Sequence, residues 1–227
     1  MPVSSLVFLF LAAAPTQPPE AVAIEDYFMV FTADRTRYNP ARAHTFAAVV
    51  RIERTASEAR VASVASLSWL PVTMKVRPLA LRPEVGRNVP LLETLQWATD
   101  NGDRINMWGP YRVQTEFADT FRARVNTVES RFQYRGACLT SPLTVCDCAR
   151  SVEEMIEPRR RYIGFFGYGA AAGSYIVKKF HSYLIDPEQT HPWVGSAIGL
   201  DSYTIRARAH GDYDDRMDQL RAMLNRK

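Results

Sequence analysis

Several features that define specialised classes of protein are scarce in this chain of 227 residues. Its three cysteines are too few for a disulfide scaffold, and no paired CxxC motifs suggest a structural zinc site. Basic and acidic residues nearly balance, 28 against 24, and the small excess is spread along the chain, which argues against a dedicated nucleic-acid-binding protein. With 47% apolar and 23% charged residues, 14 prolines and 11 glycines, the composition is that of a globular protein and excludes collagen, coiled coil and wholesale disorder.

The one long apolar run lies near the N-terminus. Residues 7–14 (VFLFLAAA) suit the core of a signal peptide but are far fewer than the roughly 20 residues of a membrane-spanning helix. The triplet at 21–23 (AVA) matches an A-x-A cleavage site. We therefore predict a signal peptide over residues 1–23, a periplasmic or secreted protein, and no transmembrane segment. Because no Lys or Arg precedes the run, a loose apolar N-terminus is the alternative.

The remaining residues, 24–227, show strand and helix patterns without repeats or low-complexity blocks. Two runs rich in β-branched and aromatic residues, 44–52 and 60–70, are separated by a short polar stretch and predict two antiparallel strands. Apolar residues recur at helical spacing from Leu91 and again from Phe117. Strands separated by helices, with hairpins among them, predict a compact single α+β domain with a small, mostly antiparallel sheet and packed helices. Further predicted elements are strands near residues 105–113, 132–138 and 202–207, a short helix after Asp147, a Gly/Ala-rich helix, and a charged helix from Asp212.

The three cysteines, Cys138, Cys146 and Cys148, lie within eleven residues of one another. An odd number in an exported protein leaves at least one thiol unpaired. Cys146 and Cys148 are too close together to bridge easily, so one interpretation is a Cys138–Cys146 disulfide with Cys148 as the spare thiol. A bridge that uses Cys148 in place of Cys146 is a second interpretation, and burial of Cys148 as a small hydrophobic residue is a third.

Cys148 stands where a helix is predicted to begin after Asp147. Unpaired amide hydrogens and the positive end of the helix dipole would lower the pKa of its thiol and supply an oxyanion site. A thiol nucleophile needs a histidine within hydrogen-bond reach. His44 is the first candidate because it begins a strand whose following residues are of core type, and His191, in a turn, is the second. The two other histidines are predicted at a solvated helix end and beside the charged tail, His181 and His210 respectively.

This order, with a histidine at the head of an early strand and a cysteine opening a later helix, resembles the circularly permuted branch of the NlpC/P60 papain-like superfamily. The resemblance is carried by HTF at 44–46 and by DCA at 147–149, where relatives of the lecithin:retinol acyltransferase type usually have Asn-Cys. Three further patterns resemble uncharacterised exported bacterial proteins: SWLP at 68–71, WGPY at 108–111 and GLD at 199–201.

The papain-like resemblance implies that Cys148 is the catalytic nucleophile, that His44 is the base, and that Ser66 or Ser68 orients the imidazole. It implies a thiol hydrolase or acyltransferase that acts on an amide or ester bond, with an envelope peptide or acyl group as the natural substrate outside the cytoplasm. The alternative, which the residues leave open, is a non-catalytic extracytoplasmic domain with structural cysteines and an aromatic surface that binds a partner.

A glycine-rich segment matches a second pattern. Residues 167–173 (GYGAAAG) precede a predicted helix, and Asp186 lies 19 residues after Gly167, as in a dinucleotide-binding fingerprint. Only about 40 residues follow Asp186, too few for the βαβ units that a doubly wound sheet needs. A helix that packs closely on a neighbour through small residues explains the same glycines, and we predict no cofactor and no metal ion.

Overall fold

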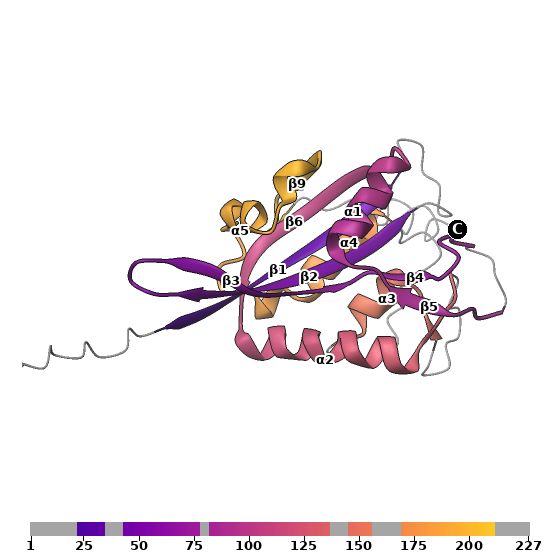
Figure 1. The fold of residues 1–227 in the computed structure, drawn as a ribbon, viewed down its shortest axis with the longest axis horizontal. Helices are drawn as coiled ribbons and strands as arrows, with labels where there is room; N and C mark the ends of the chain where they lie inside the picture. The colour runs from indigo at the N-terminus through magenta and orange to yellow at the C-terminus, as the bar shows by residue number, and fades with distance from the viewer. Residues whose placement is uncertain (1–21, 35–42, 78–81, 137–144, 156–168, 212–227) are drawn as a thin grey trace, which may run out of the picture.

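A mixed five-stranded sheet forms the centre of the molecule, in the order β3-β2-β1-β6-β9 (Figure 1). The computed structural model describes residues 22–34, 43–77, 82–136, 145–155 and 169–211. The strands of this sheet are β1 (Ala23–Asp34), β2 (His44–Arg54), β3 (Ala59–Leu67), β6 (Arg104–Val113) and β9 (Ile205–Arg208). All neighbours are antiparallel except β6 and β9, which run parallel. Two small sheets pair β4 (Trp69–Pro71) with β5 (Gly86–Asn88), and β7 (Gln133–Tyr134) with β8 (Val145–Cys146).

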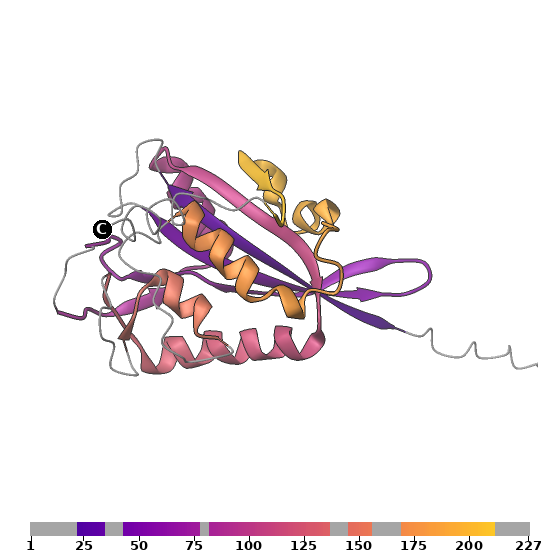
Figure 2. The same ribbon diagram turned by 180° about the vertical axis from the view of Figure 1, so that it is seen from behind.

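Helices cover both faces of the central sheet, so Figures 1 and 2 each show a helical layer in front of the strands. One face carries α1 (Leu91–Asp100) and α5 (Pro192–Ala197), and the other carries α2 (Thr115–Arg131), α3 (Cys148–Glu153) and α4 (Ala170–Lys179). Two short 3-10 helices are η1 (His181–Tyr183) and η2 (Leu200–Ser202). The predicted α+β class is confirmed. No helix in the described ranges has the length and apolar character needed to cross a membrane.

Alternation along the inner strands produces two separate cores. Phe28 and Val30 of β1 pack with α2, α3 and α4, whereas Met29 and Phe31 pack with α1 and α5. Each side chain is buried because β1 lies between β2 and β6 and both faces of the sheet are covered. The strand predicted over 60–70 is instead divided: β3 ends at Leu67, and the chain then leaves the central sheet to pair with β5.

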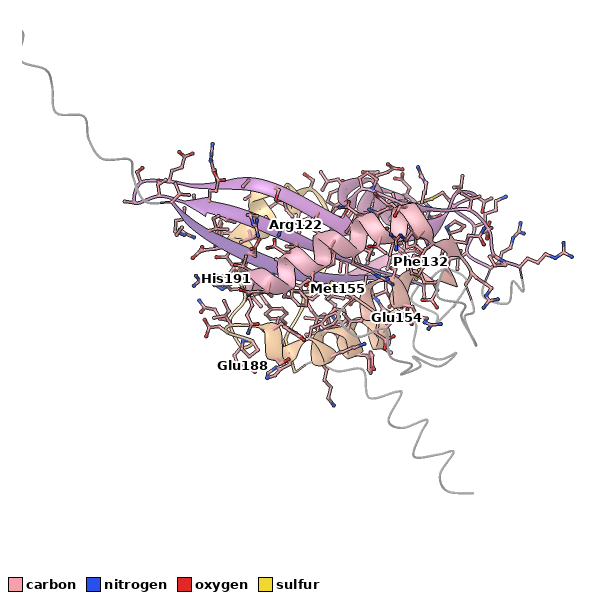
Figure 3. The ribbon with its side chains drawn as sticks, turned by 90° about the horizontal axis from the view of Figure 1, so that it is seen from below. Arg122, Phe132, Glu154, Met155, Glu188 and His191 are labelled. Carbon is pink, nitrogen blue, oxygen red and sulfur yellow. The ribbon has the colours of Figure 1, made fainter. Side chains whose placement is uncertain are left out.

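A buried carboxylate joins the longest helix to the sheet. Asp26 of β1 is fully buried and accepts hydrogen bonds at 3.0 and 2.9 Å from the guanidinium of Arg51 on β2. Arg122, labelled on α2 in Figure 3, donates to the same carboxylate at 2.9 Å. Asp119 accepts from both arginines at the surface, with 58% of its side chain exposed. Two cations therefore compensate the cost of burying Asp26 and fix where α2 crosses the strands.

Removal of this carboxylate tests its importance. We expect Asp26→Ala to lower the free energy of unfolding by about 3 kcal/mol, because it removes the buried one of the two carboxylates that the half-buried Arg51 and Arg122 share. Asp119→Ala removes an exposed acid from the same arginines and is expected to cost less than about 1 kcal/mol. Urea denaturation of both variants measures the difference, and equal effects would contradict the role given to Asp26.

Small residues allow α4 to lie directly on the sheet. A Cβ atom at Gly173 would lie 2.5 Å from Cζ3 of Trp108 and 2.6 Å from Cγ2 of Thr32, far inside normal contact distance. Gly173 is therefore explained by close packing of helix on sheet, the second of the two interpretations of the glycine-rich segment. Gly167, with which the dinucleotide pattern starts, lies outside the described residues.

We expect Gly173→Ala to destabilise the fold by about 1–2 kcal/mol. The added methyl group displaces α4 from Trp108, and this overpacking outweighs the better helix propensity of alanine. Gly211→Ala is the control, since nothing lies within 4 Å of a Cβ at that position, and we expect a change of less than about 0.5 kcal/mol. A thermal or urea unfolding series in which Gly173→Ala is more stable than the parent protein would refute the packing argument.

Candidate functional site

Cys148 opens a helix, as the sequence predicts. The carboxylate of Asp147 accepts a hydrogen bond from the backbone N–H of Arg150 at 2.9 Å, which makes Asp147 the N-cap of α3. Ser151 donates from Oγ to the carbonyl oxygen of Cys148 at 2.6 Å. The helix packs against β2, and only 2% of Cys148 is exposed. The cysteine is thus held at the start of a well-capped helix, inside the core.

Burial and the nearby charge of Asp147 together raise the pKa of the Cys148 thiol to about 12. Backbone N–H groups of Thr45, Ala149 and Cys148 itself lie near the sulfur and lower this pKa only in part. The predicted lowering of this pKa is therefore wrong: loss of water around the sulfur outweighs the helix start.

His44 stands at the head of β2, as the sequence predicts, and is also fully buried. Its Nε2 lies 2.9 Å from Oγ of Ser68, which accepts a hydrogen bond from the hydroxyl of Thr94 at 2.8 Å. The ring stacks on Phe46 at 5.2 Å and meets Trp97 of α1 edge-on at 6.0 Å. Burial lowers the pKa of His44 to about 3, so the imidazole is neutral at physiological pH.

The structure brings together His44 and one of the two residues predicted to orient it. Ser68 bonds the imidazole, whereas the carbonyl oxygen of Ser66 accepts from the side chain of Asn88. Nδ1 of His44 has no hydrogen-bond partner in the part of the chain described. The imidazole is therefore held by one hydroxyl and two aromatic rings.

The structure does not bring together His44 and Cys148. Consecutive strand residues point to opposite faces of a sheet, and His44 lies on the α1 face with Phe46, to which its ring is stacked. The sulfur of Cys148 lies near the backbone of the next residue, Thr45, on the side of α3. Across the described ranges no hydrogen bond joins the imidazole and the thiol. The expected contact fails because β2 passes between the two side chains.

The second candidate base, His191, lies elsewhere. It immediately precedes α5, and its ring meets that of Tyr27 edge-on at 5.0 Å. Its backbone N–H donates to the carbonyl of Pro110 at 2.9 Å. Burial lowers the pKa of His191. This histidine belongs to the α5 side of the sheet, opposite α3.

The cysteines do not form the predicted alternative bridge. Cys148 has a free thiol, so it takes no part in the alternative bridge, in which it would replace Cys146. Cys138 lies outside the described residues, and so does the predicted Cys138–Cys146 bridge. Among the three interpretations, the structure favours burial of Cys148 as a small hydrophobic residue.

Two buried acids lie at the two ends of α3, and no local pattern in the sequence marks them as a group. Burial raises the pKa of Asp147 to about 6 and that of Glu153 to about 7, with Lys179 at 3.6 Å opposing the shift at Glu153. Helical spacing puts Glu153 one turn after Ala149, which is the only sequence signal that it faces inward. Of the two acids, Asp147 acts on the thiol, and its negative charge disfavours a thiolate, so it suits a protonated cysteine.

Comparisons with known proteins give no independent indication of function: no family model matches the chain, and neither the curated proteins nor the solved structures contain a significant match. Within the described ranges, no group of three or more His, Cys, Asp and Glu residues is arranged to hold a metal ion.

The neutral, buried state of His44 predicts a pH dependence of stability. The pKa of the imidazole is near 6.5 in the unfolded chain and about 3 in the folded protein. Its contribution to the free energy of unfolding is therefore complete above about pH 6.5 and is lost as the pH falls toward 3. Within this pH range, protonation of His44 lowers the free energy of unfolding by at most about 1.4 kcal/mol per pH unit.

Urea unfolding from pH 8 to pH 4 checks this expectation. His44→Asn, whose amide can donate to or accept from Ser68, should show a shallower decline below pH 6.5 and the same slope as the parent protein above pH 7. Parallel curves over the whole range would show that His44 is not neutral in the folded protein.

Proposed function

We propose that the chain is a non-catalytic extracytoplasmic domain, binding or structural in role, in which Cys148 and His44 stabilise the fold. The observation that supports this is the separation of the two side chains by β2, each buried and each engaged with another partner. The extracytoplasmic part of the proposal rests on the signal-peptide pattern at residues 1–23.

The protonation states also favour a structural role. Nucleophilic attack requires the thiolate, and a thiol with a pKa of about 12 contains very little thiolate at neutral pH. Transfer of its proton to an imidazole with a pKa of about 3 is strongly unfavourable. Catalytic cysteine and histidine pairs have the opposite arrangement, with a lowered thiol pKa and a base in hydrogen-bond contact.

Few aromatic side chains in the described part of the chain are exposed, so they form little of the aromatic surface that a binding domain was expected to have. Trp69 and Trp108 are core residues, and Trp97 packs against the second core. Trp193 is the most exposed of the four tryptophans, at 37%, and the guanidinium of Arg54 lies over its ring at 5.3 Å. Among the described residues, most aromatic side chains therefore stabilise the domain instead of forming a platform for a ligand.

A second candidate function is the thiol hydrolase or acyltransferase that the papain-like resemblance implies, with an amide or ester substrate. One observation favours it: the N–H groups of Thr45, Ala149 and Cys148 face the sulfur. If α3 moved so that water and an imidazole reached the thiol, these amides would stabilise a thiolate and the oxyanion formed on the substrate.

Alkylation of Cys148 by iodoacetamide separates the two functions. In the native protein we expect no labelling of Cys148 between pH 6 and 9, because the thiol is protonated and inaccessible, and complete labelling after unfolding in urea. His44→Asn should not change this profile, since the imidazole does not contact the sulfur. Peptide mass spectrometry follows each cysteine separately, and Cys148→Ser identifies any signal from the other two.

Rapid labelling of native Cys148 with an apparent pKa below the free-thiol value of about 8.5 would overturn the proposal. A rise of that pKa in His44→Asn would then establish a cysteine and histidine pair and favour the hydrolase. Circular dichroism of each variant confirms that labelling is measured on folded protein.

A further inference from the structure

Two histidines meet on the surface, in a part of the molecule that the proposed function does not use. His181 begins η1 directly after α4, and His210 follows β9. Nδ1 of His181 lies 3.0 Å from Nε2 of His210, and the ring centroids are 4.8 Å apart. Residues 29 positions apart in the sequence thus face each other through one ring nitrogen each.

We propose that His181 and His210 form a binding site for a divalent transition-metal ion of the zinc, nickel or copper class. Imidazole nitrogen is a preferred ligand of these ions, at about 2.0–2.1 Å. Two nitrogens 3.0 Å apart at such bond lengths subtend an angle of roughly 90° at the ion. That angle is the one between neighbouring ligands in octahedral and square-planar complexes.

The surroundings of His210 fit a metal ligand. Oε1 of Glu188 lies 3.8 Å from Nδ1 of His210, on the side of the ring away from His181. At this distance Glu188 makes no hydrogen bond, but its negative charge favours the tautomer with the proton on Nδ1, and metal-bound histidines usually have such an acceptor near their other ring nitrogen. The ring of Tyr111 meets His210 edge-on at 5.9 Å and limits its rotation.

Access to the site is provided by His181. This residue and Glu188 are exposed, whereas His210 is 8% exposed and packed beneath them. No third His, Cys, Asp or Glu completes a cluster with these two residues among those described. Water would occupy the remaining positions, so the site is open and exchangeable, unlike the closed four-ligand sites of structural zinc.

Calorimetric titration with zinc, nickel and copper chlorides tests the proposal, using chelator-treated full-length protein without a histidine tag at pH 7.5. We expect one ion of at least one of these metals per chain, and loss of that binding in His181→Ala. Glu188→Gln should weaken binding by about tenfold through its effect on His210. Glu58→Gln, which changes an exposed glutamate on the β2–β3 turn, should leave the affinity unchanged.

A hydrogen bond between the two imidazoles would produce the same 3.0 Å distance without any affinity for metal. Absence of binding by the parent protein, or unchanged binding in His181→Ala, would therefore overturn the proposal. Histidine ring nitrogen NMR adds a direct readout: the ion should shift Nδ1 of His181 and Nε2 of His210 and leave His191 unaffected. Cys148→Ser should retain the binding, and loss of binding in that variant would assign the ion to the thiols instead.

Discussion

The inner strands of the central sheet, β1, β2 and β6, are buried on both faces over most of their length, and this constraint decides to which core each of their side chains belongs. A step of one residue along β1 or β2 moves a side chain from the core under α1 to the core under α3 and α4. Polar side chains on these strands must then find partners inside a core. Asp26 does so through the two arginines that join β1, β2 and α2, and His44 does so through Ser68.

The same alternation explains why the predicted catalytic pair is not assembled. Both residues occur where the sequence places them, His44 at the head of a strand and Cys148 at the start of a helix. Thr45, not His44, faces the helix layer that contains Cys148. A histidine one position later would point toward α3. The register of a single residue therefore keeps the imidazole of His44 on the face of the sheet opposite Cys148.

Local features of the fold were predictable from the sequence, and long-range ones were not. Helical spacing identified α1 and α2, and the capping carboxylate of Asp147 identified the start of α3, because these signals lie within a few residues of one another. The departure of the chain from β3 at Ser68 depends on pairing with β5, about 20 residues later. The pKa of Cys148 depends on burial by distant segments, which local sequence does not encode.

The contact between His181 and His210 is another long-range feature that the sequence did not predict. His181 and His210 looked unrelated because one follows a helix and the other follows the last strand. They meet because β9 pairs in parallel with β6, and parallel pairing requires a long connection that returns the chain to the same edge.

The histidine pair and the surroundings of α3 differ in access to water. Around α3, burial raises the pKa of the thiol and of two acids, whereas His181 is exposed to solvent beside the buried His210. A metal ion from solution binds where a ligand is accessible and its lone pair is oriented toward the ion. The histidine pair meets both conditions, whereas the buried thiol of Cys148 is not accessible.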